Sequence, residues 1–146
     1  MRALIEREGN VLLVKFADDY GPHYNWPGGG MEWGETVQEA LVREVFEETC
    51  VEVSPGELFC VFEYLPRVDM PHDIPCQTVS LIFHCTLKLE AQPHLPEKPD
   101  PCQMDVEWIA IDDLENHWVL PELTQEVKAW WHGVKKGIPM VVKRAQ

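Results

Sequence analysis

Positive charge is scarce in this chain of 146 residues, which carries 12 Lys and Arg against 25 Asp and Glu, a formal net charge of −13. Such an acidic chain repels the phosphates of nucleic acids and of anionic membranes, so neither a nucleic-acid polymer nor a membrane is expected as a partner. A small phosphorylated molecule would also be repelled unless metal ions accompanied it. The acidity is therefore compatible with a metal-assisted function, but it does not by itself indicate one.

Long apolar runs and paired cysteine motifs are absent as well. No apolar stretch approaches the roughly 18 residues of a membrane-spanning helix, and the N-terminus lacks a signal-peptide pattern. The five cysteines include no C-x-x-C pair and no zinc-type spacing with histidine, and Cys60 and Cys85 lie in strand-like apolar runs typical of buried thiols. We expect one domain over residues 1–146, without repeats or linkers, in a reducing, cytoplasmic setting.

The most informative stretch runs from Gly28 to Val51 and reads GGGMEWGETVQEALVREVFEETCV. Thr36 can cap a helix that begins near Val37, with Glu39 as its partner in a capping box. Apolar residues then recur at helical spacing, at Val37, Ala40, Leu41 and Val45. The pattern predicts an amphipathic helix.

Three glutamates, Glu44, Glu47 and Glu48, occupy positions i, i+3 and i+4 and so share one face of this helix. Glu44 and Glu48 fall on the apolar stripe and Glu47 at its edge, which places carboxylates against the packed side. Like charges at i, i+4 repel by roughly 0.2–0.5 kcal/mol per pair, and all three face the negative end of the helix dipole. Arg43 alone is not expected to neutralise them, whereas a hard divalent cation would. The alternative is an ordinary solvated acidic face.

A glycine-rich loop precedes the helix. Gly28, Gly29 and Gly30 follow Pro27, and they allow positive φ angles and close approach of the backbone to a ligand. The loop leads into the helix N-terminus, where exposed N–H groups can meet anionic oxygens. We therefore expect these three glycines to form a substrate-binding or phosphate-binding loop.

Together these residues resemble the signature of the Nudix (MutT-like) hydrolases, G-x5-E-x7-R-E-U-x-E-E-x-G-U, where U is a bulky apolar residue. Gly29 opens the match, Glu35 and Arg43-Glu44 follow at the required spacing, and the register holds to Val51. One position departs, because Cys50 stands where the family has glycine. That glycine ends the helix in a left-handed conformation, so Cys50 is expected to cost about 1 kcal/mol or to change the turn.

The resemblance implies an α/β protein with the Nudix fold, a mixed β-sheet sandwiched between helices. It also implies hydrolysis of a diphosphate linkage in a nucleoside diphosphate joined to another group. Glu44, Glu47 and Glu48 match the family's magnesium ligands, with Mn²⁺ as an alternative ion, and Glu44 is the best signature candidate for polarising the water. Arg43 would pair with Glu35 and hold the loop against the helix. A further acid from a later loop often completes such sites, and the candidates here are Glu97, Asp100 and Asp105.

The substrate stays open among ADP-ribose, other nucleotide sugars, dinucleoside polyphosphates and nucleoside triphosphates. Pro66 lies fifteen positions after Val51 (66 − 51), a spacing associated with ADP-ribose hydrolases. The proline-rich loop from Leu65 to Cys76 carries groups that could face a substrate, namely Arg67, Asp69, His72 and Asp73. A homodimer is compatible with the sequence.

Two other classes deserve weight. A catalytically silent, nucleotide-binding relative would have lost one or more signature acids, and all of them are present here. An isoprenoid-diphosphate isomerase of the same superfamily would need a catalytic cysteine and glutamate in its own patterns, which are not evident.

Alternation and turn residues predict the remaining elements. The chain opens almost directly in a strand, where members of this family often carry a few more residues upstream. Strands are expected on either side of a turn at Gly9-Asn10, then a polar loop at 17–25, strands at 58–64, 78–89 and 105–111, and a helix at 121–135 stopped by Gly137 and Pro139. Trp108 is expected in the core. Tyr20, Tyr24 and Trp26 could each stack on a nucleobase or pack against the sheet.

Overall fold

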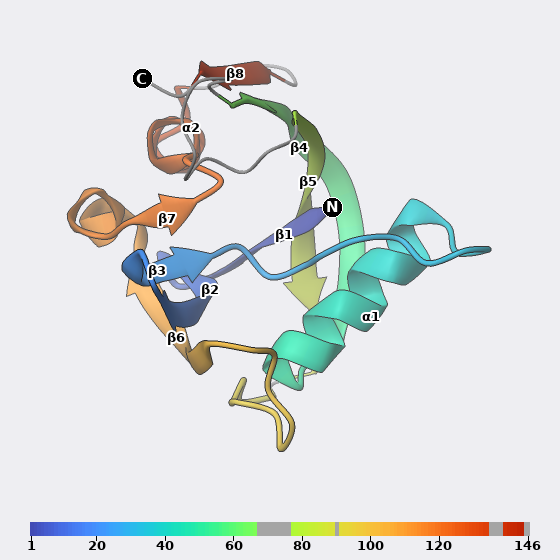
Figure 1. The fold of residues 1–146 in the computed structure, drawn as a ribbon. Helices are drawn as coiled ribbons and strands as arrows, with labels where there is room; N and C mark the ends of the chain where they lie inside the picture. The colour runs from blue at the N-terminus through green and yellow to red at the C-terminus, as the bar shows by residue number, and fades with distance from the viewer. Residues whose placement is uncertain (67–76, 90, 135–138, 145–146) are drawn as a thin grey trace.

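The structure is a computed structural model that describes residues 1–66, 77–89, 91–134 and 139–144 (Figure 1). The elements in chain order are β1 (Arg2–Arg7), β2 (Asn10–Asp18), β3 (Gly21–Asn25), α1 (Val37–Thr49), β4 (Val53–Leu65), β5 (Thr78–Leu87), β6 (Gln103–Ala110), the 3₁₀ helix η1 (Ile111–Asn116), β7 (Val119–Leu120), α2 (Thr124–Trp131) and β8 (Met140–Arg144). Within the described residues, neither α-helix is long and apolar enough to cross a membrane.

The strands form one mixed sheet in the order β7-β3-β2-β1-β5-β4-β8, with β6 paired to β2. β1 joins the two halves of this sheet. It pairs antiparallel with β2 beside the hairpin, at Glu6↔Val11, and parallel with β5 from Arg2↔Ile82 to Ile5↔Cys85. The start of β1 is therefore free of β2, and there it meets the loop that precedes α1.

Two apolar cores lie on opposite faces of the sheet, because alternate residues of a strand point to opposite sides. On β1, Ala3 and Ile5 pack with Leu41 and Val45 of α1, whereas Leu4 packs in the core that contains Val127 of α2. One helix thus covers each face. This arrangement confirms the expected mixed sheet between helices.

The first hairpin turns one residue earlier than predicted. Its two turn residues are Glu8 and Gly9, both with positive φ (53° and 77°), as in the type I′ turns that match strand twist. Asn10 instead begins β2, and its side-chain amide donates to the carbonyls of Arg7 and Glu8 at 3.4 and 3.1 Å.

The prediction of a polar loop over residues 17–25 is wrong. β2 continues to Asp18 and β3 pairs with it from Val14↔Asn25 to Asp18↔Gly21. β3 is rich in glycine, proline and polar residues, which do not favour a strand, so its sequence does not predict one. Its hydrogen bonds come from the neighbouring strands on both sides, β2 and β7. Tyr24 (8% exposed) and Trp26 (0%) are core residues, so for these two the packing alternative is the correct one.

The C-terminal region also differs from its prediction. α2 ends at Trp131, and Gly133 adopts a positive φ of 70° just beyond it, which ends the helix earlier than the expected stop at 137–139. A further strand, β8, then pairs parallel with β4 from Val61↔Met140 onward. Trp108 packs against the α1-side core as expected, with the Arg7 guanidinium 4.4 Å from its ring centroid.

Candidate active site

Helix α1 begins and ends as its sequence predicts. Thr36 accepts a hydrogen bond from the Glu39 backbone N–H (3.3 Å), and the Glu39 carboxylate accepts one from the Thr36 N–H (2.8 Å), which completes a capping box. At the other end, Cys50 adopts the left-handed conformation (φ 58°, ψ 19°) that a glycine would adopt more easily. The helix exit is therefore kept, with strain at Cys50.

Glu48 is the buried member of the acidic set, with 5% of its surface exposed. Its Oε2 accepts a hydrogen bond from the backbone N–H of Gly28 at 2.8 Å, while its Oε1 has no hydrogen-bond partner among the described residues. Burial raises the pKa of Glu48 to about 7, although the Gly28 hydrogen bond and the charge of Arg2 oppose the rise. An ionised carboxylate at this place is costly unless another positive charge joins it.

Arg43 forms hydrogen bonds with the other signature carboxylates, those of Glu35, Glu44 and Glu47. It binds Glu35 with two parallel hydrogen bonds, Nε to Oε1 at 2.7 Å and Nη2 to Oε2 at 3.0 Å. Its Nη1 lies 3.1 Å from both Glu44 Oε1 and Glu47 Oε2. The hydrogen bond from Arg43 lowers the pKa of Glu35 to about 2. Arg43 thus offsets more of the negative charge than expected, whereas Glu48 is not among its partners.

The three glutamates of the helix differ in the exposed fraction of their side chains. The Glu48 side chain is buried, that of Glu44 is 17% exposed, and that of Glu47 is 57% exposed. The face shared by Glu44 and Glu48 therefore points toward the glycine loop, and Glu47 lies at its solvent edge. This order of exposure agrees with the positions of the three residues on the helical wheel.

The glycine loop is packed tightly against both the helix and β1. A Cβ at Gly29 would lie 2.7 Å from Oε1 of Glu44, so any side chain there collides with this carboxylate. Gly28 has a φ of 132°, and a Cβ there would lie 2.9 Å from the Cα of Arg2. Gly30 differs, because nothing described lies within 4 Å of its Cβ position, and it contributes its carbonyl to Arg43 Nη2 at 3.1 Å.

Two residues that join this site carry no signal in the sequence. Arg2, at the start of β1, donates from Nη1 to the carbonyls of Trp26 (3.0 Å) and Gly28. Gln103, at the start of β6, is buried and donates to the backbone carbonyl of Glu48 at 2.8 Å. Both lie far from the signature in sequence, and the pairing of the strands brings them to it.

The signature loop and helix are thus assembled around a buried carboxylate, and comparison with known proteins agrees with this motif. The family model described as the NUDIX domain matches residues 2–132. The chain belongs to the Nudix family.

Curated relatives of this Nudix chain match it over part of its length. An ADP-ribose pyrophosphatase of Methanocaldococcus jannaschii is 45% identical over 81 residues, which cover 55% of this chain and 45% of that protein. The diphosphoinositol polyphosphate phosphohydrolase 3-alpha of Mus musculus is 48% identical over 58 residues, 40% of this chain and 35% of that protein. The chain therefore spans less than half of the length of these relatives.

Solved structures share the fold over almost the whole chain. A NUDIX hydrolase from Nitrosomonas europaea superposes with a TM-score of 0.73 at 22% identity, covering 99% of this chain and 77% of that one. An ADP-ribose pyrophosphatase from Streptococcus suis gives a TM-score of 0.65 at 17% identity, covering 97% and 96%. At these identities the likeness establishes the Nudix fold alone.

The three loop acids of this Nudix domain lie in different surroundings. Gln103 connects Asp100 to the helix, because its Oε1 accepts from the Asp100 N–H (3.2 Å) and its Nε2 donates to the Glu48 carbonyl. The charge of Asp100 also contributes to the raised pKa of Glu48. Asp105 pairs with Lys15 in the β2–β6 ladder and accepts from the Val106 N–H, and all three acids, Glu97 included, are exposed. Asp100 is thus the acid associated with Glu48.

Within the described residues, no three His, Cys, Asp or Glu side chains converge as a ready metal cage. Glu44 and Glu47 are turned to Arg43, and Glu48 to Gly28. The loop residues named above as substrate-facing candidates, Arg67, Asp69, His72 and Asp73, lie outside the described residues. Pro66 directly follows the last residue of β4.

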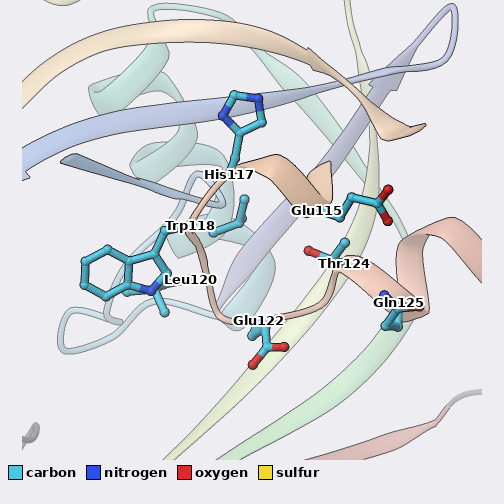
Figure 2. Close-up of a pocket in the computed structure, with 8 residues that line it drawn as sticks. Glu115, His117, Trp118, Leu120, Glu122, Thr124 and Gln125 are labelled. Carbon is cyan, nitrogen blue, oxygen red and sulfur yellow. The ribbon is translucent and has the colours of Figure 1, made fainter. Parts of the chain in front are cut away.

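A cavity of about 310 Å³ opens at the edge of the sheet beyond β7 (Figure 2). Residues from the end of η1 to the start of α2 line it: Glu115, His117, Trp118, Val119, Leu120, Glu122, Thr124 and Gln125. None of the signature residues is among them, and we assign this cavity no part in the chemistry.

Proposed function

We propose that this Nudix domain hydrolyses a diphosphate linkage in a nucleoside diphosphate joined to another group, with Mg²⁺ or Mn²⁺ as cofactor. The observation that carries the proposal is the buried carboxylate of Glu48, held by the Gly28 N–H with its second oxygen unpaired among the described residues. Burial disfavours the ionised form of this carboxylate, so its charge costs stability unless a cation is nearby. Such a group is explained by a cation that binds during function.

The chemistry of the donors fits a hard divalent ion. Glu44, Glu47 and Glu48 would hold it, and all three offer carboxylate oxygens, the ligands that Mg²⁺ prefers. A magnesium ion needs only one or two protein carboxylates when substrate phosphates complete its shell, so a preformed three-carboxylate cage is not required. When bound, the ion would supply charge neutralisation at the phosphates and a more acidic water.

The side chains and backbone of the protein would position the substrate and the attacking water, and would supply the electrostatic field of the site. Glu44 would polarise the attacking water, since it lies against Gly29 with most of its surface shielded from solvent. Arg43 and Glu35 would hold the glycine loop on the helix. Asp100 would be the additional acid, because its negative charge is near enough to raise the pKa of Glu48. The backbone of Gly28 and Gly29 would border the diphosphate.

ADP-ribose or a related nucleotide sugar is the substrate that we propose first. The relative in Methanocaldococcus jannaschii is named an ADP-ribose pyrophosphatase, and Pro66 stands at the spacing associated with that activity. Nucleoside triphosphates and dinucleoside polyphosphates complete the set to be tested.

A phosphate-release screen with Mg²⁺, with and without chelator, tests the proposal. The panel holds ADP-ribose, nucleotide sugars, dinucleoside polyphosphates and nucleoside triphosphates, with phosphatase or pyrophosphatase as coupling enzyme. A strong, chelator-sensitive signal with one class would support it and identify the substrate. Silence across the panel, from protein that still binds these nucleotides, would instead indicate a catalytically silent nucleotide-binding relative.

A further inference from the structure

Gly28 connects two oppositely charged side chains. Its backbone N–H donates to Oε2 of Glu48 at 2.8 Å, and its carbonyl accepts a hydrogen bond from Nη1 of Arg2. The same Arg2 nitrogen also binds the Trp26 carbonyl at 3.0 Å. The Arg2 guanidinium is therefore fixed beside the glycine loop, on the side where the loop meets the acidic helix.

The positive charge of Arg2 interacts electrostatically with two of the signature acids, Glu44 and Glu48. Burial lowers the pKa of Arg2, while the negative charges of Glu48 and Glu44 raise it, so both carboxylates lie within its electrostatic reach. No carboxylate forms a hydrogen bond or an ion pair with Arg2 in the described part of the chain. Arg2 is thus a partly buried cation that is neutralised only at a distance, and an anionic partner would lower its free energy.

The two arginines at this site differ in how much of their hydrogen-bonding capacity is used. In Arg43 all three guanidinium nitrogens have partners, in Glu35, Glu44, Glu47 and the Gly30 carbonyl. In Arg2 only Nη1 is engaged among the described residues, which leaves Nε and Nη2 without an acceptor. A guanidinium presents its donors as a planar fork suited to phosphate oxygens.

We propose that Arg2 binds a phosphate oxygen of the substrate through Nε and Nη2, next to the carboxylates of Glu44 and Glu48. This inference rests on the proposed function, since it assigns a binding residue to the same diphosphate. Nη1 would keep its two carbonyls and hold the loop, while the other nitrogens contact the anion. Arg2 would then supply positive charge from the protein, in a chain whose net charge of −13 otherwise repels phosphate.

The test compares Arg2→Met with Arg7→Met, a matched change on the same strand. Arg7 stacks over Trp108, away from the glycine loop, so its replacement serves as the control. Binding of inorganic pyrophosphate in the presence of Mg²⁺ is measured by calorimetry, together with the shift in melting temperature caused by Mg²⁺ alone. We expect Arg2→Met to weaken pyrophosphate binding by at least about tenfold, the loss typical of a hydrogen bond to a charged group, and Arg7→Met to leave it unchanged.

Arg2→Lys covers the case in which Arg2→Met does not fold. Lysine keeps the charge and a donor for the loop carbonyls but lacks the second arm of the fork, so weaker pyrophosphate binding is again expected, with the Mg²⁺ shift retained. Wild-type affinity for pyrophosphate in Arg2→Met or Arg2→Lys would overturn the proposal. Loss of the Mg²⁺ shift together with pyrophosphate binding would also overturn it, because Arg2 would then only support the loop. If the wild type binds pyrophosphate through Arg2 yet hydrolyses nothing in the panel, the assignment of Arg2 is supported and the proposed function fails.

Discussion

Glu48 and Gly28 are joined by a hydrogen bond of 2.8 Å between a buried carboxylate and a backbone N–H. This contact ties the acidic end of α1 to the glycine loop. It also leaves one carboxylate oxygen without a partner among the described residues, in surroundings that disfavour its charge. The stability of the protein and its proposed chemistry therefore depend on the same side chain.

Replacement of Glu48 by glutamine is expected to stabilise the metal-free protein. Burial raises the folded-state pKa of Glu48 from 4.5 to about 7, so the native state holds a proton that the unfolded state has lost between these values. Stability should thus fall as pH rises from about 4.5 to 7, by about 3 kcal/mol at most. In chelator at pH 8, Glu48→Gln should melt above the wild type, and at pH 4.5 the two should converge. Equal melting temperatures at pH 8 would contradict the burial of an ionisable Glu48.

The glycine loop offers a matched pair of substitutions. Gly29→Ala places a methyl group against the Glu44 carboxylate and should lower kcat/KM by at least about tenfold, since small displacements of catalytic groups are costly. Gly30→Ala meets nothing described within 4 Å and should keep near-wild-type kinetics. Steady-state kinetics on the best substrate, with circular dichroism as a folding control, measure both. Equal effects at the two positions would show that the contact of Gly29 with Glu44 does not matter.

Cys50→Gly should raise stability without improving the chemistry. The left-handed conformation of Cys50 costs roughly 1–2 kcal/mol for a residue with a Cβ, and glycine would remove this cost. The greater flexibility of glycine in the unfolded chain would offset about 0.4–1 kcal/mol of the gain. A net gain of about 0.5–1 kcal/mol is expected in urea unfolding. Cys102, with a φ of 67°, is a second left-handed position, where glycine should act in the same direction. A loss of stability in Cys50→Gly would show that its side chain has a contact that outweighs the strain.

Asp100 and Glu97 can be separated by neutral isosteres. Asp100→Asn should lower the rate, because the charge of Asp100 acts on Glu48, whereas Glu97→Gln should not, because no interaction of Glu97 with the signature acids is found among the described residues. The comparison is made as kcat at saturating substrate and Mg²⁺. A rate loss confined to Glu97→Gln would reassign the additional acid.

The signature helix could be predicted closely because its determinants are local. The capping box of Thr36 and Glu39, the apolar stripe and the order of exposure of the three glutamates all follow from spacing along one helix. The family signature extends this local information to Arg43 and Glu35. The roles of these residues in metal binding and catalysis stay predictions.

Non-local pairing explains the elements that the prediction missed. β3 is rich in glycine, proline and polar residues and is a strand only because β2 and β7 bond it on both sides. β8 was missed, and it too depends on a distant partner, β4. Arg2 and Gln103 reach the site for the same reason, and nothing in their local sequence distinguishes them from polar residues expected at the surface.

The most direct test of Glu48 as a metal ligand is hydrolysis by Glu48→Gln, measured beside the wild type in Mg²⁺ on the substrate that the screen identifies. We expect the variant to fold, to melt at least as high as the wild type in chelator, to gain little stability from Mg²⁺, and to lose several orders of magnitude in rate. Near-normal turnover by Glu48→Gln would contradict the assignment of this carboxylate to the metal site, and with it the proposed mechanism.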